Sequence, residues 1–256
     1  MKSTLRTLAL TAGLALASTG AQAALITINY STAANAEDAF LNTLAGVTVT
    51  ETFNGYDAGA GYITSPEAGE PQQKKYENIS TAGVFNTAVG TFELLTAGQV
   101  NGNPEREELL IESKNTGEFG RQALSDGSDG DLWLDSNDAE LVRWTLGAPL
   151  TGSFNAFGFY ISDATDQGAT LTLKFTNGTS AQVVLPAFNT DGNVGYITIT
   201  SDTGVVGGVL DFINSNGKDG WGIDDITVGT VPEPGTLLLM GLGLLGLGAA
   251  RRRNAA

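Results

Sequence analysis

Two adjacent aspartates near the end of the chain, Asp224 and Asp225, are the residues best suited by type and spacing to metal chemistry. They lie in the segment Ile223 to Ile226, whose apolar flanks and length are typical of a short strand. Because successive side chains of a strand point to opposite faces, the two carboxylates cannot both face the same side. One of them turns toward the core or a sheet edge, where a bound calcium ion or a ring of backbone N–H groups would compensate its charge.

Missing residue types narrow the chemistry further. The chain has no cysteine and no histidine, and its two methionines, Met1 and Met240, lie in its terminal segments. This composition excludes a Ser-His-Asp triad, a thiolate nucleophile and the usual nitrogen or sulfur ligands of zinc, copper and iron. A metal would be a hard, oxygen-binding ion, calcium above all. A glycosidase pair of carboxylates stays open, because the sequence does not single out which acids would form it.

A second acidic cluster runs from Ser125 to Asp138. An EF-hand loop needs oxygen side chains at its first, third and fifth positions, and no register provides them. A loop that begins at Asp126 has Gly130 in fifth position, and one that begins at Asp129 has Trp133 there. We therefore expect a solvated turn in this cluster.

The body of the chain has the pattern of an all-β protein with one helix. Asn35 precedes the helical segment 36–45, and Asn177-Gly178 joins two apolar runs as a hairpin. Short period-2 segments predict strands at 24–30, 47–53, 91–96, 108–113, 141–146, 154–162, 169–176, 180–186, 195–200, 208–213 and 222–229. Many short strands with glycine-rich turns favour an antiparallel β-sandwich of two sheets.

Aromatic side chains are the natural platforms for a sugar ligand. Phe157 and Phe159 flank a glycine on one strand face, so we expect them in the core. The segment from about 54 to 80 is rich in Gly, Pro, Glu and Gln and predicts a long mobile loop. Tyr56 and Tyr62 lie in that loop and are the aromatic residues we expect to contact a ligand.

The C-terminal segment, 231–256, has three parts. Val231, Pro232, Glu233 and Pro234 precede the apolar span 235–250, and Arg251, Arg252 and Arg253 begin the basic tail 251–256. As a helix, the apolar run from Thr236 would rise about 22 Å, less than the ~30 Å of a bilayer core. We expect a marginal transmembrane helix with its arginines on the cytoplasmic side.

This order of motif, span and basic cluster resembles the PEP-CTERM sorting signal of Gram-negative bacteria. The resemblance implies processing by a membrane exosortase at the inner membrane, followed by delivery to a cell surface or extracellular matrix rich in exopolysaccharide. The opposite end of the chain agrees, since Lys2 and Arg6 precede an apolar stretch and Ala21-Gln22-Ala23 suits signal peptidase. Residues 1–23 are therefore predicted to be a signal helix that is removed after export.

The remaining body, 24–230, is predicted to be one acidic β-sandwich domain. The two terminal segments hold five of the 13 basic residues and one of the 28 acidic residues. The body therefore has 8 basic and 27 acidic residues and a net charge of −19. Such a surface repels phosphates, so we expect no nucleic-acid partner.

The body also resembles jelly-roll domains such as MAM domains and carbohydrate-binding modules. The resemblance depends on the segment Ile223 to Ile226, on an early "Phe-Glu" strand and on the strand 154–162. It implies that the early and late strands lie side by side and hold a structural calcium. Here Asn54 follows Phe53 where those domains have glutamate, and Glu51 is the substitute ligand, so the implied set is Glu51, Asn54, Asp224 and Asp225.

Two functions from different classes remain. The first is a non-catalytic structural or adhesive protein of the cell surface, associated with exopolysaccharide, with calcium optional. The alternative is a carbohydrate-active enzyme or carbohydrate-binding module on the same jelly-roll scaffold. No catalytic motif supports the enzyme, so we expect no enzymatic activity.

Overall fold

The structure, a computed structural model, describes part of the chain, and its strands form two layers that one long strand joins. The described residues are 24–56, 61–62, 75–78, 84–96, 109–113, 131–136, 139, 141–146, 154–162, 168–184, 194–213, 221–232 and 243. The predicted signal helix and C-terminal transmembrane helix lie outside them, apart from Gly243. Within the described ranges, no helix has both the length and the apolar character needed to cross a bilayer.

One helix, α1 (Ala36–Leu41), accompanies fourteen described strands. The strands are β1 (Ile26–Ser31), β2 (Ala45–Glu51), β3 (Gly61–Tyr62), β4 (Lys75–Asn78), β5 (Val84–Thr87), β6 (Gly90–Thr96), β7 (Leu110–Ser113), β8 (Leu132–Asp135), β9 (Leu141–Leu146), β10 (Phe154–Ser162), β11 (Gly168–Phe175), β12 (Ser180–Val184), β13 (Val194–Ile213) and β14 (Gly222–Thr230).

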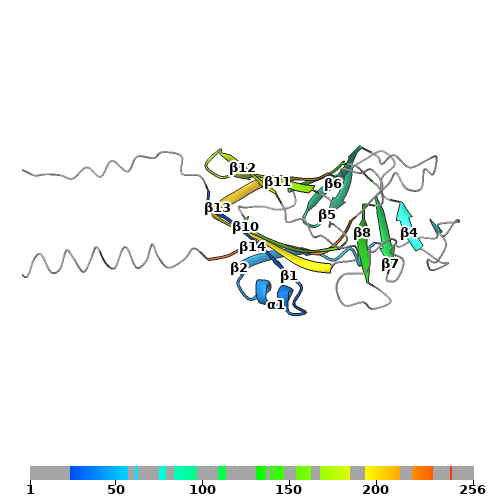
Figure 1. Cartoon of the computed structure of the whole chain (residues 1–256), viewed down its shortest axis with the longest axis horizontal. Coiled ribbons are helices and arrows are strands. Elements are labelled where there is room, and N and C mark those ends of the chain that lie inside the picture. The colour runs from blue at the N-terminus through cyan, green and yellow to red at the C-terminus, as the bar shows by residue number, and fades with distance from the viewer. Residues whose placement is uncertain are drawn as a thin grey trace, which may run out of the picture.

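The long strand β13 belongs to both layers. Its first part, 194–201, pairs with β1 and β10, and its second part, 205–213, pairs with β9 and β11. At the start of the second part, Val205 also pairs with Phe154 of β10. We call the layer of β2, β14, β10, the first part of β13 and β1 the first sheet; β8, β7, β4 and β3 extend it beyond β14. The second sheet runs β12, β11, the second part of β13, β9, β6 and β5. All of these pairs are antiparallel, and Figure 1 shows β11 and β12 above the level of β14 and β2.

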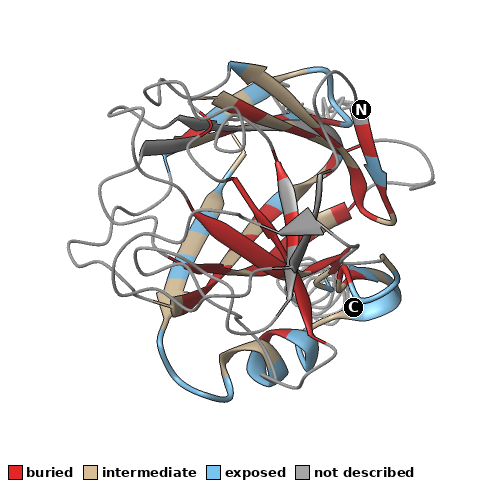
Figure 2. Ribbon diagram, turned by 90° about the vertical axis from the view of Figure 1, so that its right-hand side faces the viewer, coloured by how far each residue is buried: buried red, intermediate tan, exposed pale blue. Residues whose placement is uncertain are grey.

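The main core lies between the sheets. Phe157 and Phe159 of β10 are almost fully buried there, as predicted, and the Trp144 ring meets the Phe159 ring edge-on at 6.1 Å. Each fully buried apolar side chain of this size stabilises the fold by about 1.5–3 kcal/mol. Figure 2 shows the buried segments gathered along the central strands. The predicted jelly-roll-like antiparallel sandwich is thereby confirmed.

Helix α1 covers the outer face of the first sheet (Figure 1). Phe40 packs on Ala156 and Tyr196, with 5.9 Å between the two ring centroids. The helix near the N-terminus is confirmed, but it ends at Leu41 and not at residue 45. Asn35 is the N-cap residue, as predicted, but its side chain makes no capping hydrogen bond. Tertiary packing of Phe40 holds the short helix instead.

Of the remaining predictions about the strands and loops, one is confirmed and the others are corrected. The hairpin is confirmed: β11 and β12 pair around Asn177-Gly178, and Gly178 has φ +81°. Segments 195–200 and 208–213 are one strand, because β13 continues through its change of sheet. The acidic cluster is not a solvated turn in its described part, since 132–135 forms β8 with Trp133 fully buried. The predicted loop 54–80 contains β3 and β4, and its other residues beyond Tyr56 lie outside the described ones.

Candidate functional site

The early and late strands lie side by side, as the jelly-roll resemblance implied. β2 pairs with β14, and Glu51 lies opposite Ile226. The pairing of β14 with β10 shifts by one residue between Thr227 and Asp224, which is a β-bulge. Asp225 lies in this bulge with φ +44°, a conformation that aspartate tolerates better than most residues do.

Glu51 is a buried carboxylate that backbone groups satisfy. Its side chain is 8% exposed, and its Oε1 accepts a 2.8 Å hydrogen bond from the Phe53 N–H. Oε2 accepts another of 2.8 Å from the Ala88 N–H, and the Tyr56 hydroxyl lies 3.5 Å from the same oxygen. A ring of N–H donors therefore compensates this charge within the protein.

Asn54 and Tyr56, also predicted site residues, both contact the body. The Asn54 Oδ1 accepts a 2.6 Å hydrogen bond from the Leu132 N–H, which connects the β2 end to β8. The partly buried Tyr56 ring packs 4.8 Å from the Phe85 ring, and its hydroxyl donates to the Asn86 carbonyl at 3.1 Å. The backbone of Tyr62 pairs with β4, and its side chain is not among those described.

Asp224 lies on the other side of the first sheet from Glu51. Residues directly opposite each other in a ladder share a face. Glu51 lies opposite Ile226, a core residue, whereas Asp224 lies opposite Tyr160, which packs under α1. Asp224 is fully buried, and its Oδ1 accepts a 2.7 Å hydrogen bond from the Asp225 N–H.

Glu51 and Asp224 thus lie on opposite faces of the first sheet, so the structure does not bring these two implied calcium ligands together. Within the described ranges, no three acidic side chains converge in a metal-binding arrangement. Calcium remains a prediction for the implied set, and the outer-face pair, Asp224 and Asp225, is the part of it that we test below.

A second acidic group, Glu37 of α1, faces the same region. The pKa of Glu37 is raised to about 7, first by burial and then by the charges of Asp225 and Asp38. A hydrogen bond with Tyr160 lowers this pKa but does not outweigh those causes. Burial and then Glu37 and Asp225 raise the pKa of Tyr160 to about 12. The pKa of Tyr196 is also raised, chiefly by burial and next by the charge of Glu37. The region concentrates negative charge under a short helix.

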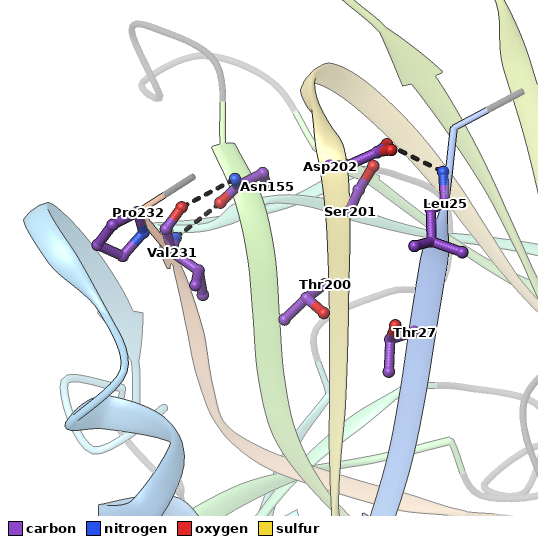
Figure 3. A pocket seen from close by; sticks show the side chains of 8 residues that line it. All are labelled: Leu25, Thr27, Asn155, Thr200, Ser201, Asp202, Val231 and Pro232. Carbon is purple, nitrogen blue, oxygen red and sulfur yellow. Dashed lines mark hydrogen bonds between the residues drawn. The ribbon is translucent and has the colours of Figure 1, made fainter. Parts of the chain in front are cut away.

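The two ends of the body meet at a cavity that the sequence did not indicate. The cavity holds about 170 Å³ and is lined by Leu25, Thr27, Asn155, Thr200, Ser201, Asp202, Val231 and Pro232 (Figure 3). Leu25 is the second residue after the predicted signal-peptide cleavage point, and Val231 and Pro232 open the sorting motif. Glu233, Pro234 and the three arginines lie outside the described residues.

Polar side chains hold both ends at this cavity. The Asn155 Oδ1 accepts a 2.7 Å hydrogen bond from the Val231 N–H, and the Asn155 Nδ2 donates a 3.1 Å hydrogen bond to the Val231 carbonyl. On β13, the Asp202 Oδ1 accepts a 2.9 Å hydrogen bond from the Leu25 N–H. Asn155 and Val231 are 76 residues apart, so no local pattern could have paired them.

Comparison with known proteins gives a specific match for the C-terminal segment. Residues 230–253 match the PEP-CTERM protein-sorting motif, so the predicted resemblance is confirmed there. No curated protein matches the chain.

Solved carbohydrate-binding modules are similar to the body in outline. The CBM22-1 xylan-binding domain of Paenibacillus barcinonensis Xyn10C has 10% identity and a TM-score of 0.28, over 73% of this chain and 97% of that one. The family 11 module from Clostridium thermocellum, in complex with a mixed-linked tetrasaccharide, has 9% identity and a TM-score of 0.25, over 74% and 100%. The two modules CBM22-1 and GH10 of Clostridium thermocellum xylanase 10B have 14% identity and a TM-score of 0.26, over 41% of this chain and 23% of that one. The chain thus spans about a quarter of that xylanase structure, and at these TM-scores the likenesses carry no argument about ligands.

Proposed function

We propose that this chain is an exported surface protein whose C-terminal segment is processed by an exosortase-type enzyme. The observation that carries the proposal is the sorting-motif match at 230–253, which begins at the last residue of β14. The motif therefore continues directly from a core strand. The predicted signal peptide at the other end supplies export, and signal peptidase is the first processing partner.

The mass of the mature protein tests this proposal. In a Gram-negative host that carries an exosortase-type enzyme, we expect a chain that begins at Ala24 and lacks the residues after about Pro234. The matched control is the same host without the enzyme, which should retain Arg251, Arg252 and Arg253. A mature protein that keeps this basic cluster in the presence of the enzyme contradicts the proposal.

The role we propose for the body is structural or adhesive and non-catalytic, in association with exopolysaccharide. Two buried carboxylates, Glu51 and Asp224, accept hydrogen bonds from the protein's own backbone, which supports a structural role for these two side chains. Retention of the purified body on the host's own polysaccharide, measured by co-sedimentation, checks the association. Release of soluble sugar from that polysaccharide would overturn the non-catalytic role and favour the carbohydrate-active alternative.

A further inference from the structure

The sorting motif begins inside the folded body. Its first residue, Thr230, ends β14 and pairs with Ala45 of β2. The next residue, Val231, is partly buried and packs against the cluster of Phe40, Ala156 and Tyr196. The first two residues of the segment that a processing enzyme would recognise are therefore also structural residues of the sandwich.

Asn155 holds Val231 by both of its backbone polar groups. The backbone pairing of β10 with β14 reaches its last partners at Ala156 and Gly229. Beyond that point the Asn155 amide accepts from the Val231 N–H and donates to the Val231 carbonyl (Figure 3). The amide thus provides for Val231 both hydrogen bonds that a neighbouring strand would provide. We call this pair of bonds the Asn155 clamp.

An equivalent contact holds the other end of the body. The Leu25 N–H donates to the Asp202 side chain at 2.9 Å, and the Asp202 N–H donates to the Leu25 carbonyl at 3.2 Å. Asp202 and Asn155 lie on neighbouring strands and line the same cavity. Both chain ends therefore leave the fold side by side, which suits a body that is attached to one membrane at both ends before processing.

Recognition of an extended peptide by an enzyme commonly uses the main-chain N–H and C=O groups of that peptide. At Val231 the Asn155 clamp occupies both groups. We propose that Asn155 restrains C-terminal processing: it holds the start of the sorting motif on the body, and the enzyme binds the motif only after the clamp has opened. This inference rests on the proposed function. When opening and closing are fast, the cleavage rate follows the fraction of molecules in the open state.

The test compares Asn155→Ala with Asp202→Ala in the full chain. The first variant removes both bonds to Val231, and the second removes the side-chain bond to Leu25 at the other end. Loss of two ordinary hydrogen bonds raises the open fraction roughly ten-fold or more. We expect pulse-labelled Asn155→Ala chains to be processed about ten-fold faster than native chains, and Asp202→Ala chains at the native rate. Asn155→Asp keeps the acceptor for the Val231 N–H, so its processing rate should lie between those of Asn155→Ala and the native chain.

Hydrogen exchange at the Val231 amide of the detergent-solubilised chain is the second measurement. Protection should be lost in Asn155→Ala and kept in Asp202→Ala, because only the first change removes the acceptor. Processing of Asn155→Ala at or below the native rate overturns the inference. Equal acceleration in both variants also overturns it, because that result indicates general loosening of the cavity. Absence of cleavage in the native chain contradicts the proposed function itself, so the two failures are distinguishable.

Discussion

The Ala88 N–H donates a 2.8 Å hydrogen bond to Oε2 of Glu51 and so joins the two sheets of the sandwich. Glu51 ends β2 in the first sheet, and Ala88 lies in the turn between β5 and β6 in the second. The other carboxylate oxygen accepts from the N–H of Phe53, a fully buried residue with φ +54°. One acidic side chain therefore links the layers and supports a strained backbone conformation.

The first prediction concerns this carboxylate. Glu51→Ala leaves the buried Phe53 N–H and the partly buried Ala88 N–H without their acceptor. A buried group left in this state costs about 1–3 kcal/mol. We expect the free energy of unfolding to fall by roughly 3 kcal/mol in Glu51→Ala, measured by urea denaturation. Glu51→Gln keeps one acceptor oxygen and should lose about half as much. A loss well under 1 kcal/mol in Glu51→Ala would show that water replaces the carboxylate.

Local signals in the sequence were sufficient for the elements and for one pair of strands. Alternating apolar residues located β10, and Asn177-Gly178 located the β11–β12 hairpin, because a tight turn needs a residue that accepts positive φ. The neighbouring position of β2 and β14 followed from the jelly-roll resemblance. These features depend on residues close together in the chain or on a family motif.

The predicted site was less accessible from sequence, for a physical reason. The bulge at Asp225 changes the residues that face outward, so Glu51 and Asp224 lie on opposite faces although their strands are neighbours. A strict two-residue alternation cannot anticipate an inserted residue. Strand β8 was also missed, because the acidic residues around Trp133 are typical of a turn. The tertiary structure instead buries the Trp133 ring.

Gly158 lets α1 approach the first sheet, which gives a second prediction. A Cβ at Gly158 would come within 2.5 Å of the Phe40 ring and would also overlap the Tyr196 hydroxyl. Overpacking of this kind costs about 1–3 kcal/mol. We expect Gly158→Ala to lower the unfolding free energy by that amount, measured by urea denaturation. Gly55→Ala is the matched control, because nothing lies within 4 Å of a Cβ there, and equal losses in both variants would contradict the packing argument.

Calcium gives a third prediction. An ion that binds only the native state raises its stability by RT ln(1 + [Ca²⁺]/Kd). We therefore expect the Tm of the full chain to be higher in calcium than in chelator, and the difference to vanish in Asp224→Asn. Magnesium at equal ionic strength is the control for general screening of the acidic surface. A Tm that is equal in calcium and in chelator would rule out the outer-face pair as a calcium site.

The last prediction concerns pH and the pair Glu37 and Asp225. The pKa of Glu37 rises from 4.5 to about 7, first through burial and then through the charge of Asp225. The folded state therefore binds this proton more tightly than the unfolded state, so stability falls as pH rises from about 4.5 to about 7. Tyr160, the hydrogen-bond partner, stays neutral throughout this range because its pKa is about 12. Asp38 is the other acidic neighbour that raises the Glu37 pKa.

We expect the Tm of the native chain to rise as pH is lowered from 8 toward 5, and Glu37→Gln to have a shallower dependence because it lacks the titrating group. Asp225→Asn tolerates the positive φ and removes the like charge, so it should lower the Glu37 pKa, followed by NMR of the Glu37 carboxyl carbon. Other acids of the body also gain protons in this range, so the decisive quantity is the difference in slope between the native chain and Glu37→Gln. Identical slopes would mean that Glu37 titrates as an ordinary exposed glutamate, with its proton equally bound in both states.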